Sequence, residues 1–323
     1  MLMGLTTLLG NMFGGSSSQA TVGPVSQKGA RGTQRFQYCA FLDRENANPD
    51  SSAFQKAWKF LEQDMAVVPA GPVRLSENRV QDGSQMEDVE VVASQRVEVD
   101  SFYIDKAAVT NADFHNFVKA GGYENMEYWA QDVWSHVLQF VDQTGVQAPM
   151  YWQNGKPSRE LLDHPVVGVS WYEADAYARW VGKQLPDSAQ WQRAVSWHLA
   201  KNDDSLPPKF PWGDTFESKY ANAWISGIGK TVPVDKYYDG ATPNGVYQLI
   251  GNTWEMQNNR FVFQNQEPEK SIGDLIEIRG GAFDTYLDSQ MTSHFRTGHP
   301  LQMRAPNVGF RCVKSVSEFR RPE

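Results

Sequence analysis

The sequence is poor in cysteine, and this excludes several classes of site. Its two cysteines, Cys39 and Cys312, lie at opposite ends of the chain. Two distant thiols provide neither a disulfide framework nor a cysteine metal cluster. We favour two buried or free thiols, and a single long-range disulfide is the alternative. The sequence also contains no G-x-S-x-G motif, so nothing in it supports a serine hydrolase of that type.

Basic residues are outnumbered, with 30 Lys and Arg against 38 Asp and Glu, and they form no run. A nucleic-acid surface needs a basic patch, so we expect no nucleic-acid partner. The apolar residues 1–15 are interrupted by glycines and are too short to span a bilayer, and they lack the basic start of a signal peptide. We therefore expect a protein without a membrane span that is cytoplasmic rather than secreted. We also expect it to be bacterial.

The composition changes along the chain and predicts four parts. Residues 1–35 form a flexible N-terminal tail, because 15–34 are rich in Gly and Ser. Residues 36–64 form a connecting segment whose apolar stripe predicts a helix near its end. Residues 65–315 form one large domain, and residues 316–323 form a C-terminal tail. A tail of this composition needs a partner to order it, so we expect it to bind another protein.

Capping residues mark the helices within the domain. Thr110 and Asp113 have the spacing of a helix N-terminus, and Asp187 and Gln190 form a capping box. Alternating and continuous apolar runs indicate strands. The sequence therefore predicts helices over 111–120, 173–182 and from 187, strands within 65–75, 97–104 and 166–170, and an exposed polar loop over 78–95.

Aromatic residues are concentrated in an insertion over 123–159. Exposed aromatics are typical of binding surfaces, so Trp129, Trp134 and Trp152 are candidates for contact with a protein partner.

Several motifs occur in one order: FPWGD at 210–214, YANAW at 220–224, GNTWEM at 251–256, RGGAF at 279–283 and NVGFRC at 307–312. Together they resemble the formylglycine-generating enzyme, or sulfatase-modifying factor, family. The resemblance covers residues 65–313. It implies an α+β fold, a variant of the C-type lectin fold with many short strands and a few helices. A shared fold does not settle the activity.

The resemblance also locates the chemistry that is missing. Catalytic members of the family bind one copper ion through two thiols just after the RGG-S/A-F motif, and Thr285 and Gln290 occupy those positions here. Thiolates are the ligands that suit Cu(I), so we expect no copper. A second branch binds iron through histidines of a preceding helical domain. The chain has no histidine before Met65, so we expect no iron of that kind.

Calcium is the metal that the resemblance favours, at positions matching Asn222, Asn252 and Glu255. Oxygen ligands suit this ion. The first position is weakened because the loop 226–231 is short and lacks the family's aspartate. The alternative is that Asn252 and Glu255 only brace the turn through hydrogen bonds.

Trp224 matches a core position of the family, so we interpret it as packing. The family's core arginines are expected to pair with buried carboxylates; they match Arg279, Arg296 and Arg311.

Three functions compete. The first is a non-catalytic binding or scaffold subunit that docks through its N-terminal tail and displays a ligand-reading loop with Asp284, Tyr286, Asp288 and Gln290. The second is an oxidoreductase with a non-thiol mechanism, whose candidate residues are His294, His299, Tyr286 and Asp288. The third is a lectin-like ligand-binding protein. Convergence of the oxidoreductase candidates in one concave pocket would favour the second.

Overall fold

The computed structural model describes residues 37–43, 50–80, 89–199, 206–261 and 274–318, and the side chains of 77–94 are outside this description. The chain divides at residue 31, and all described residues lie in the second unit, 32–323. The α-helices are α2 (Tyr38–Leu42), α3 (Ser52–Asp64), α4 (Asn111–Lys119), α5 (Trp134–Val137), α6 (Trp171–Val181) and α7 (Ser188–Ser196). Short 3-10 turns are η2 (Met126–Tyr128), η3 (Gln131–Val133), η4 (Arg159–Leu161), η5 (Trp224–Ser226), η6 (Tyr238–Gly240), η8 (Asp288–Met291) and η9 (Val316–Glu318).

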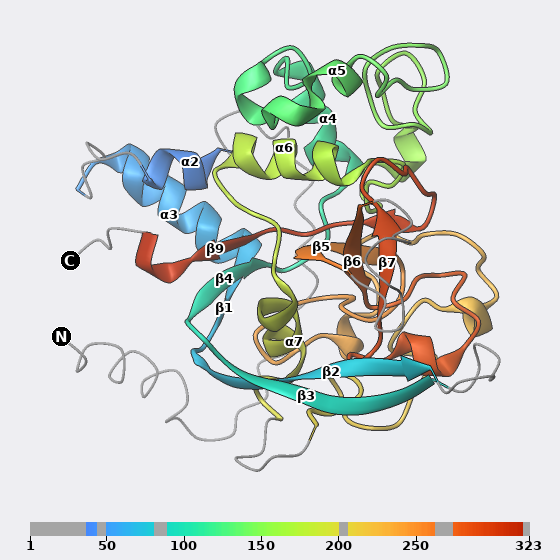
Figure 1. Cartoon of the computed structure of the whole chain (residues 1–323). Helices are drawn as coiled ribbons and strands as arrows, with labels where there is room; N and C mark the ends of the chain where they lie inside the picture. The colour runs from blue at the N-terminus through green and yellow to red at the C-terminus, as the bar shows by residue number, and fades with distance from the viewer. Residues whose placement is uncertain (1–36, 44–49, 81–88, 200–205, 262–273, 319–323) are drawn as a thin grey trace. The chain divides into compact units, whose positions relative to one another are not determined.

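The described strands form three small sheets (Figure 1). One joins β1 (Met65–Val68), β4 (Phe102–Asp105) and β9 (Val313–Ser315). The second is a hairpin of β2 (Gly71–Val80) and β3 (Val89–Val99). The third has the order β7 (Arg296–Pro300), β6 (Leu275–Arg279), β5 (Trp254–Arg260) and β8 (Val308–Gly309). Only β5 and β8 pair in parallel among these strands. The predicted combination of short strands and few helices is confirmed.

Two predicted segments are wrong. Residues 78–80 and 89–95 of the polar run are strands rather than loop, because β2 continues to Val80 and β3 begins at Val89, and these two residues pair; residues 81–88 lie outside the described part of the chain. Backbone pairing in a long hairpin, supported by several β-branched valines in β3, outweighs the polar composition. The predicted strand at 166–170 is irregular and makes only a bridge between Thr110 and Pro165 beside it. Val166 and Val169 are buried, as expected, but they pack without a strand partner.

The predicted helices are confirmed, with α6 beginning two residues early. Thr110 and Asp113 make a reciprocal capping box on α4, and Asp187 and Gln190 make another on α7. Ser170 caps α6, and Gly182 ends it in the left-handed conformation. Strong caps at these ends fix where each helix starts against the sheets.

The insertion 123–159 packs against α4 and α6 and belongs to the largest core cluster. A second cluster lies around α7 and the turn before β5, and a third joins α2 and α3 to β1 and β4. Among the described residues, no helix combines the length and apolar character needed to cross a bilayer.

Candidate functional site

The turn before β5 is built on two residues in the left-handed region. Gly251 has φ 81° and Asn252 has φ 69°, as the Gly-Asn pair predicts. A side chain at 251 is excluded sterically, because a Cβ would lie 2.6 Å from the carbonyl oxygen of Asn222. The backbone N–H of Asn252 donates to that same oxygen at 2.8 Å. The turn therefore fixes Asn222 and Asn252 side by side.

The two asparagines are held mainly by hydrogen bonds within the fold. Asn252 Oδ1 accepts from the Val232 N–H at 2.8 Å and from Asn222 Nδ2 at 3.2 Å. Asn252 Nδ2 donates to Gln248 at 2.7 Å, and Asn222 Nδ2 donates to the Lys230 carbonyl at 2.9 Å. Asn222 Oδ1 is buried and has no hydrogen-bond partner within the described part of the chain. One spare oxygen thus lies beside the turn.

Glu255 does not join them. Its carboxylate accepts from Arg311 Nε at 2.8 Å and Nη2 at 2.6 Å, and from Trp191 Nε1 at 2.8 Å. Both charges are almost completely buried. Calcium takes about six to eight oxygen ligands, usually with carboxylates among them. The described residues contain no group of three or more His, Cys, Asp or Glu placed to hold a metal. Of the three predicted calcium ligands, Asn222 has one buried oxygen without a partner, and the Glu255 carboxylate is already bound by Arg311 and Trp191. These residues therefore do not fit a calcium site as predicted.

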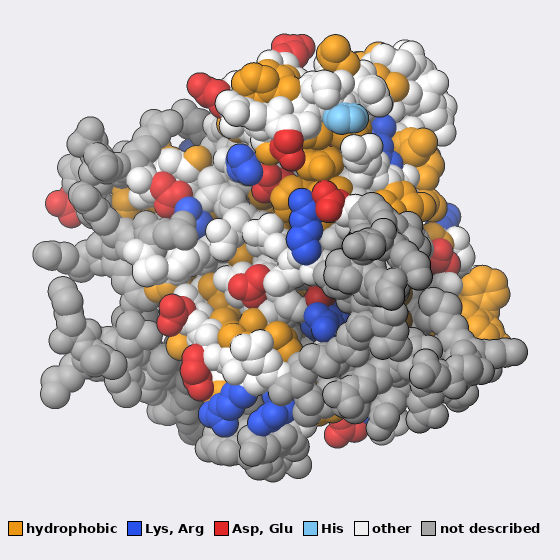
Figure 2. All heavy atoms as spheres, viewed as in Figure 1, with side chains coloured by type: hydrophobic (Ala, Val, Ile, Leu, Met, Phe, Trp, Pro, Cys, Tyr) orange, Lys and Arg blue, Asp and Glu red, His pale blue; other side chains and the backbone are white. Residues whose placement is uncertain are grey.

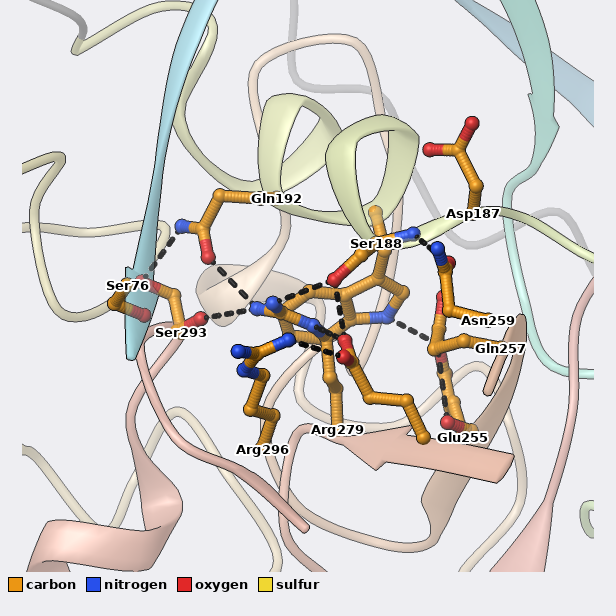
Figure 3. A network of polar contacts seen from close by, with 12 residues as sticks. Ser76, Asp187, Ser188, Gln192, Glu255, Gln257, Asn259, Arg279, Ser293 and Arg296 are labelled. Atoms are coloured by element: carbon orange, nitrogen blue, oxygen red, sulfur yellow. Dashed lines mark hydrogen bonds and ion pairs between the residues drawn. The ribbon is translucent and has the colours of Figure 1, made fainter. Parts of the chain in front are cut away.

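A second buried ion network lies between α7 and β6 (Figure 3). The Arg279 guanidinium contacts Glu277 and donates to Gln192 and to Ser188, both at 2.8 Å. Arg296 donates to the other oxygen of Glu277 at 3.0 Å. Burial alone raises the pKa of Glu277, but the two arginines and a hydrogen bond from Ser188 outweigh it and lower the pKa. The expected pairing of core arginines with buried carboxylates is confirmed.

Thr285 and Gln290, which the resemblance matches to the family's thiol pair, lie on the loop that follows β6. Thr285 is buried, and its Oγ1 accepts from the Ala282 N–H at 2.8 Å, closing a tight turn. Gln290 is half-buried in η8.

The two cysteines of the chain lie elsewhere, Cys39 in α2 and Cys312 between β8 and β9. Both are buried free thiols. Burial raises the pKa of Cys39 to about 12 and that of Cys312 well above its usual value. Both thiols therefore stay protonated at neutral pH.

The four oxidoreductase candidates are not brought together. His294 and His299 are buried, and their Nε2 atoms donate to the carbonyls of Pro207 and Met303. Burial lowers the pKa of both imidazoles, so they are neutral at pH 7. Tyr286 and Asp288, in contrast, are exposed to solvent. These histidines act as hydrogen-bonded core residues.

An exposed group of side chains lies on the same loop. Tyr286 is 71% exposed and packs edge to face against Trp224, which is 58% exposed, with ring centroids 6.2 Å apart. The Trp224 N–H donates to the Thr285 carbonyl at 3.4 Å, which ties η5 to the loop. Asp284 is exposed and accepts from Asn307. We define the Trp224–Tyr286 surface by its five exposed residues, Trp224, Ile225, Asp284, Tyr286 and Asp288.

The sequence interpretation of Trp224 as packing is wrong. The side chain of Trp224 is 58% exposed, and residues 225 and 227–230 that follow it are exposed as well. Hydrophobic side chains reach the surface at the right edge of Figure 2, where η5, gold in Figure 1, lies. Two of the three insertion tryptophans are instead buried. Trp129 donates to the Gly122 carbonyl and Trp152 to Asn111, and only Trp134, 44% exposed, reaches solvent.

Comparison with known proteins gives a family match. Residues 49–316 match the model of the Sulfatase-modifying factor enzyme 1-like domain. The chain is similar to hercynine oxygenase of Mycobacterium tuberculosis, with 29% identity over 58% of this chain and 46% of that protein. It is also similar to the formylglycine-generating enzyme of Mus musculus, with 27% identity over 96% of this chain and 92% of that protein. The chain spans about half the length of the hercynine oxygenases that it matches.

Two further likenesses bear on fold and activity. A protein of Bos taurus named inactive C-alpha-formylglycine-generating enzyme 2 is 27% identical over 69% of this chain and 80% of its own length. The crystal structure of CarF superposes with a TM-score of 0.51 at 16% identity, over 78% of this chain and 98% of CarF. The structural likeness shows the fold alone, and the predicted α+β fold is confirmed.

Proposed function

Because the chain belongs to the sulfatase-modifying factor family, we propose that it is a non-catalytic member that acts as a binding or scaffold subunit of a larger protein assembly. It displays the Trp224–Tyr286 surface, which η5 forms together with the loop where catalytic relatives carry their thiols. Its N-terminal tail, residues 1–35, docks to a protein partner.

The observation that carries this proposal is the replacement of the thiol pair. At the matching positions, Thr285 uses its hydroxyl to close a turn and Gln290 is an amide. Neither side chain can provide a thiolate for copper. The exposed aromatic and acidic residues around Thr285 suit a binding loop, since Trp and Tyr are enriched where proteins bind one another. The existence of an inactive relative in Bos taurus agrees with loss of activity within the family.

The alternative is an oxidoreductase with a non-thiol mechanism, which the likeness to hercynine oxygenases favours. One observation weighs against it. The candidate histidines are buried, donate to backbone carbonyls and lie apart from the exposed Tyr286 and Asp288 in their contacts. A general acid or base must reach its substrate, and His294 and His299 are only 7% and 5% exposed.

Other expectations remain predictions. They are a bacterial, cytoplasmic protein, no nucleic-acid partner, no copper or iron, and a lectin-like role for the exposed loop as a further alternative. The insertion 123–159 presents Trp134 as its remaining exposed tryptophan for contact with a partner.

The proposal is tested by affinity purification of the native chain with and without residues 1–35, followed by mass spectrometry and metal analysis. We expect a defined partner that is recovered only with the tail, and no stoichiometric copper or iron. A chain that purifies alone with one equivalent of a redox metal would overturn the proposal. The Thr285→Cys, Gln290→Cys double variant is the control for copper: it restores the thiols on the same loop and is expected to gain Cu(I).

A further inference from the structure

The Trp224–Tyr286 surface combines aromatic faces with negative charge. Tyr286 lies between Asp284 and Asp288 in the sequence, and all three are exposed. Asp284 is held in place by Asn307 Nδ2, at 3.0 and 3.1 Å from its two oxygens. An aromatic face beside carboxylates attracts cationic groups, through the ring quadrupole and through ion pairing. The surface therefore suits a ligand that carries Lys or Arg side chains.

One segment of the chain has the complementary charge. Residues 1–36 contain Lys28, Arg31 and Arg35 and no acidic residue, whereas all 38 Asp and Glu follow. The three cations fall within 24–36, whose sequence is PVSQKGARGTQRF. A whole second copy, with net charge −8, would be repelled by an acidic surface, but this segment would be attracted.

We propose that residues 24–36 of one copy bind the Trp224–Tyr286 surface of a second copy of this chain. The inference rests on the proposed function and names the partner of the tail. Contact between two different surfaces is head-to-tail, so it builds open chains or closed rings of subunits.

The point at which the tail leaves the domain favours a second copy over the same copy. Gln37 Nε2 donates to the Trp180 carbonyl at 3.2 Å, and the buried Lys183 ammonium donates to the Tyr38 hydroxyl at 2.9 Å. At Gly182, a Cβ would lie 2.4 Å from the backbone nitrogen of Ala40, so α2 and the end of α6 are in close contact.

This anchor limits the reach of the basic segment. Nine residues from Gln37 back to Lys28 span about 30 Å at full extension. The helix α2 packs on α3 and α6 at the left of Figure 1, whereas η5 lies at its right edge. The anchor and η5 thus lie on opposite sides of the described domain in Figure 1, so binding to a neighbouring copy does not require the segment to cross its own domain.

The test is sedimentation velocity of the full-length chain over a range of concentrations, at low and at high salt. We expect reversible self-association that weakens as salt rises, because the contact is electrostatic. The tail variant Lys28→Glu, Arg31→Glu, Arg35→Glu should be monomeric. The control variant Lys59→Glu, Lys119→Glu, Lys156→Glu makes the same change of net charge at exposed positions outside the contact. It should still self-associate under conditions in which the tail variant is monomeric.

The surface is tested by Trp224→Ser with Tyr286→Ser, which should weaken association by about tenfold or more. Leu138→Ser, at a residue 76% exposed on the insertion, is the matched control and should leave association unchanged. A mixture of the tail variant and this surface variant should form mixed dimers. The surface variant supplies an intact basic segment, and the tail variant supplies an intact Trp224–Tyr286 surface. Circular dichroism checks that every variant is folded.

A monomer at all concentrations, or association that survives both the tail and the surface variants, overturns the inference. The proposed function fails separately. If the full-length chain is monomeric but its tail still captures a different protein, the scaffold proposal stands and only the identity of the partner is wrong.

Discussion

Two neighbouring regions of this molecule use polar residues in opposite ways. Between α7 and the β5–β6 sheet, Glu255 and Glu277 are buried, and their charges are satisfied by arginines at hydrogen-bond distance. On the loop that follows β6, Asp284, Tyr286 and Asp288 are exposed, and Trp224 is uncovered beside them. The first region holds the frame together, and the second is free to change. Substitutions on the exposed loop are therefore expected to disturb the frame far less than substitutions in the buried network.

The largest expected effect is in the buried region. Arg311→Ala leaves the Glu255 carboxylate buried without its partner, so we expect a loss of about 3–5 kcal/mol in the free energy of unfolding. Urea denaturation measures it. Arg296→Ala is the matched control, because that side chain is 27% exposed and Glu277 keeps Arg279. A loss below about 1 kcal/mol for Arg311→Ala would show that the frame does not depend on this pair.

A smaller effect is expected from acid. The pKa of Glu277 is lowered below its ordinary 4.5, so its stabilisation is complete above that value and is lost as pH falls through the lowered pKa. Each unit of lowering contributes about 1.4 kcal/mol. Urea midpoints measured between about pH 3 and pH 6 should fall less steeply with acid in Glu277→Gln than in the native chain.

Glu173 provides the control of opposite sign. Burial raises its pKa despite Arg304, so its contribution is largest at low pH and is lost as pH rises through the raised pKa. Glu173→Gln should therefore make the fall of stability in acid steeper. Identical dependence of stability on pH in the native chain and both variants would show that the pKa values of Glu277 and Glu173 are not shifted in the predicted directions.

The smallest effect is expected on the exposed loop. Tyr286→Ala removes a ring that is 71% exposed, so the free energy of unfolding should change by less than about 0.5 kcal/mol in the same urea assay. A loss comparable to that of Arg311→Ala would erase the contrast between the two regions and would assign Tyr286 to the frame.

Much of the frame was predictable because its signals are local. The capping residues of α4 and α7 and the Gly251–Asn252 turn depend on the conformation of a few adjacent residues. The ordered motifs from FPWGD to NVGFRC identified the family, and the match over residues 49–316 confirms it. The extension of the β2–β3 hairpin over residues 78–80 and 89–95 was missed because strand pairing links residues that are distant in sequence, and polar composition does not report it.

The candidate site was less predictable, since it depends on which side chains the fold covers. The sequence by itself determined the family and the caps, and it places Thr285 and Gln290 at the positions that the family resemblance matches to the thiol pair. Only the tertiary structure decided that Trp129, Trp152, His294 and His299 are buried, that Glu255 faces Arg311 rather than Asn252, and that Trp224 lies beside Tyr286 at the surface. The exposure of a side chain and its choice of partner depend on the packing of segments that are far apart in the chain. A local sequence pattern does not show which of these segments come together.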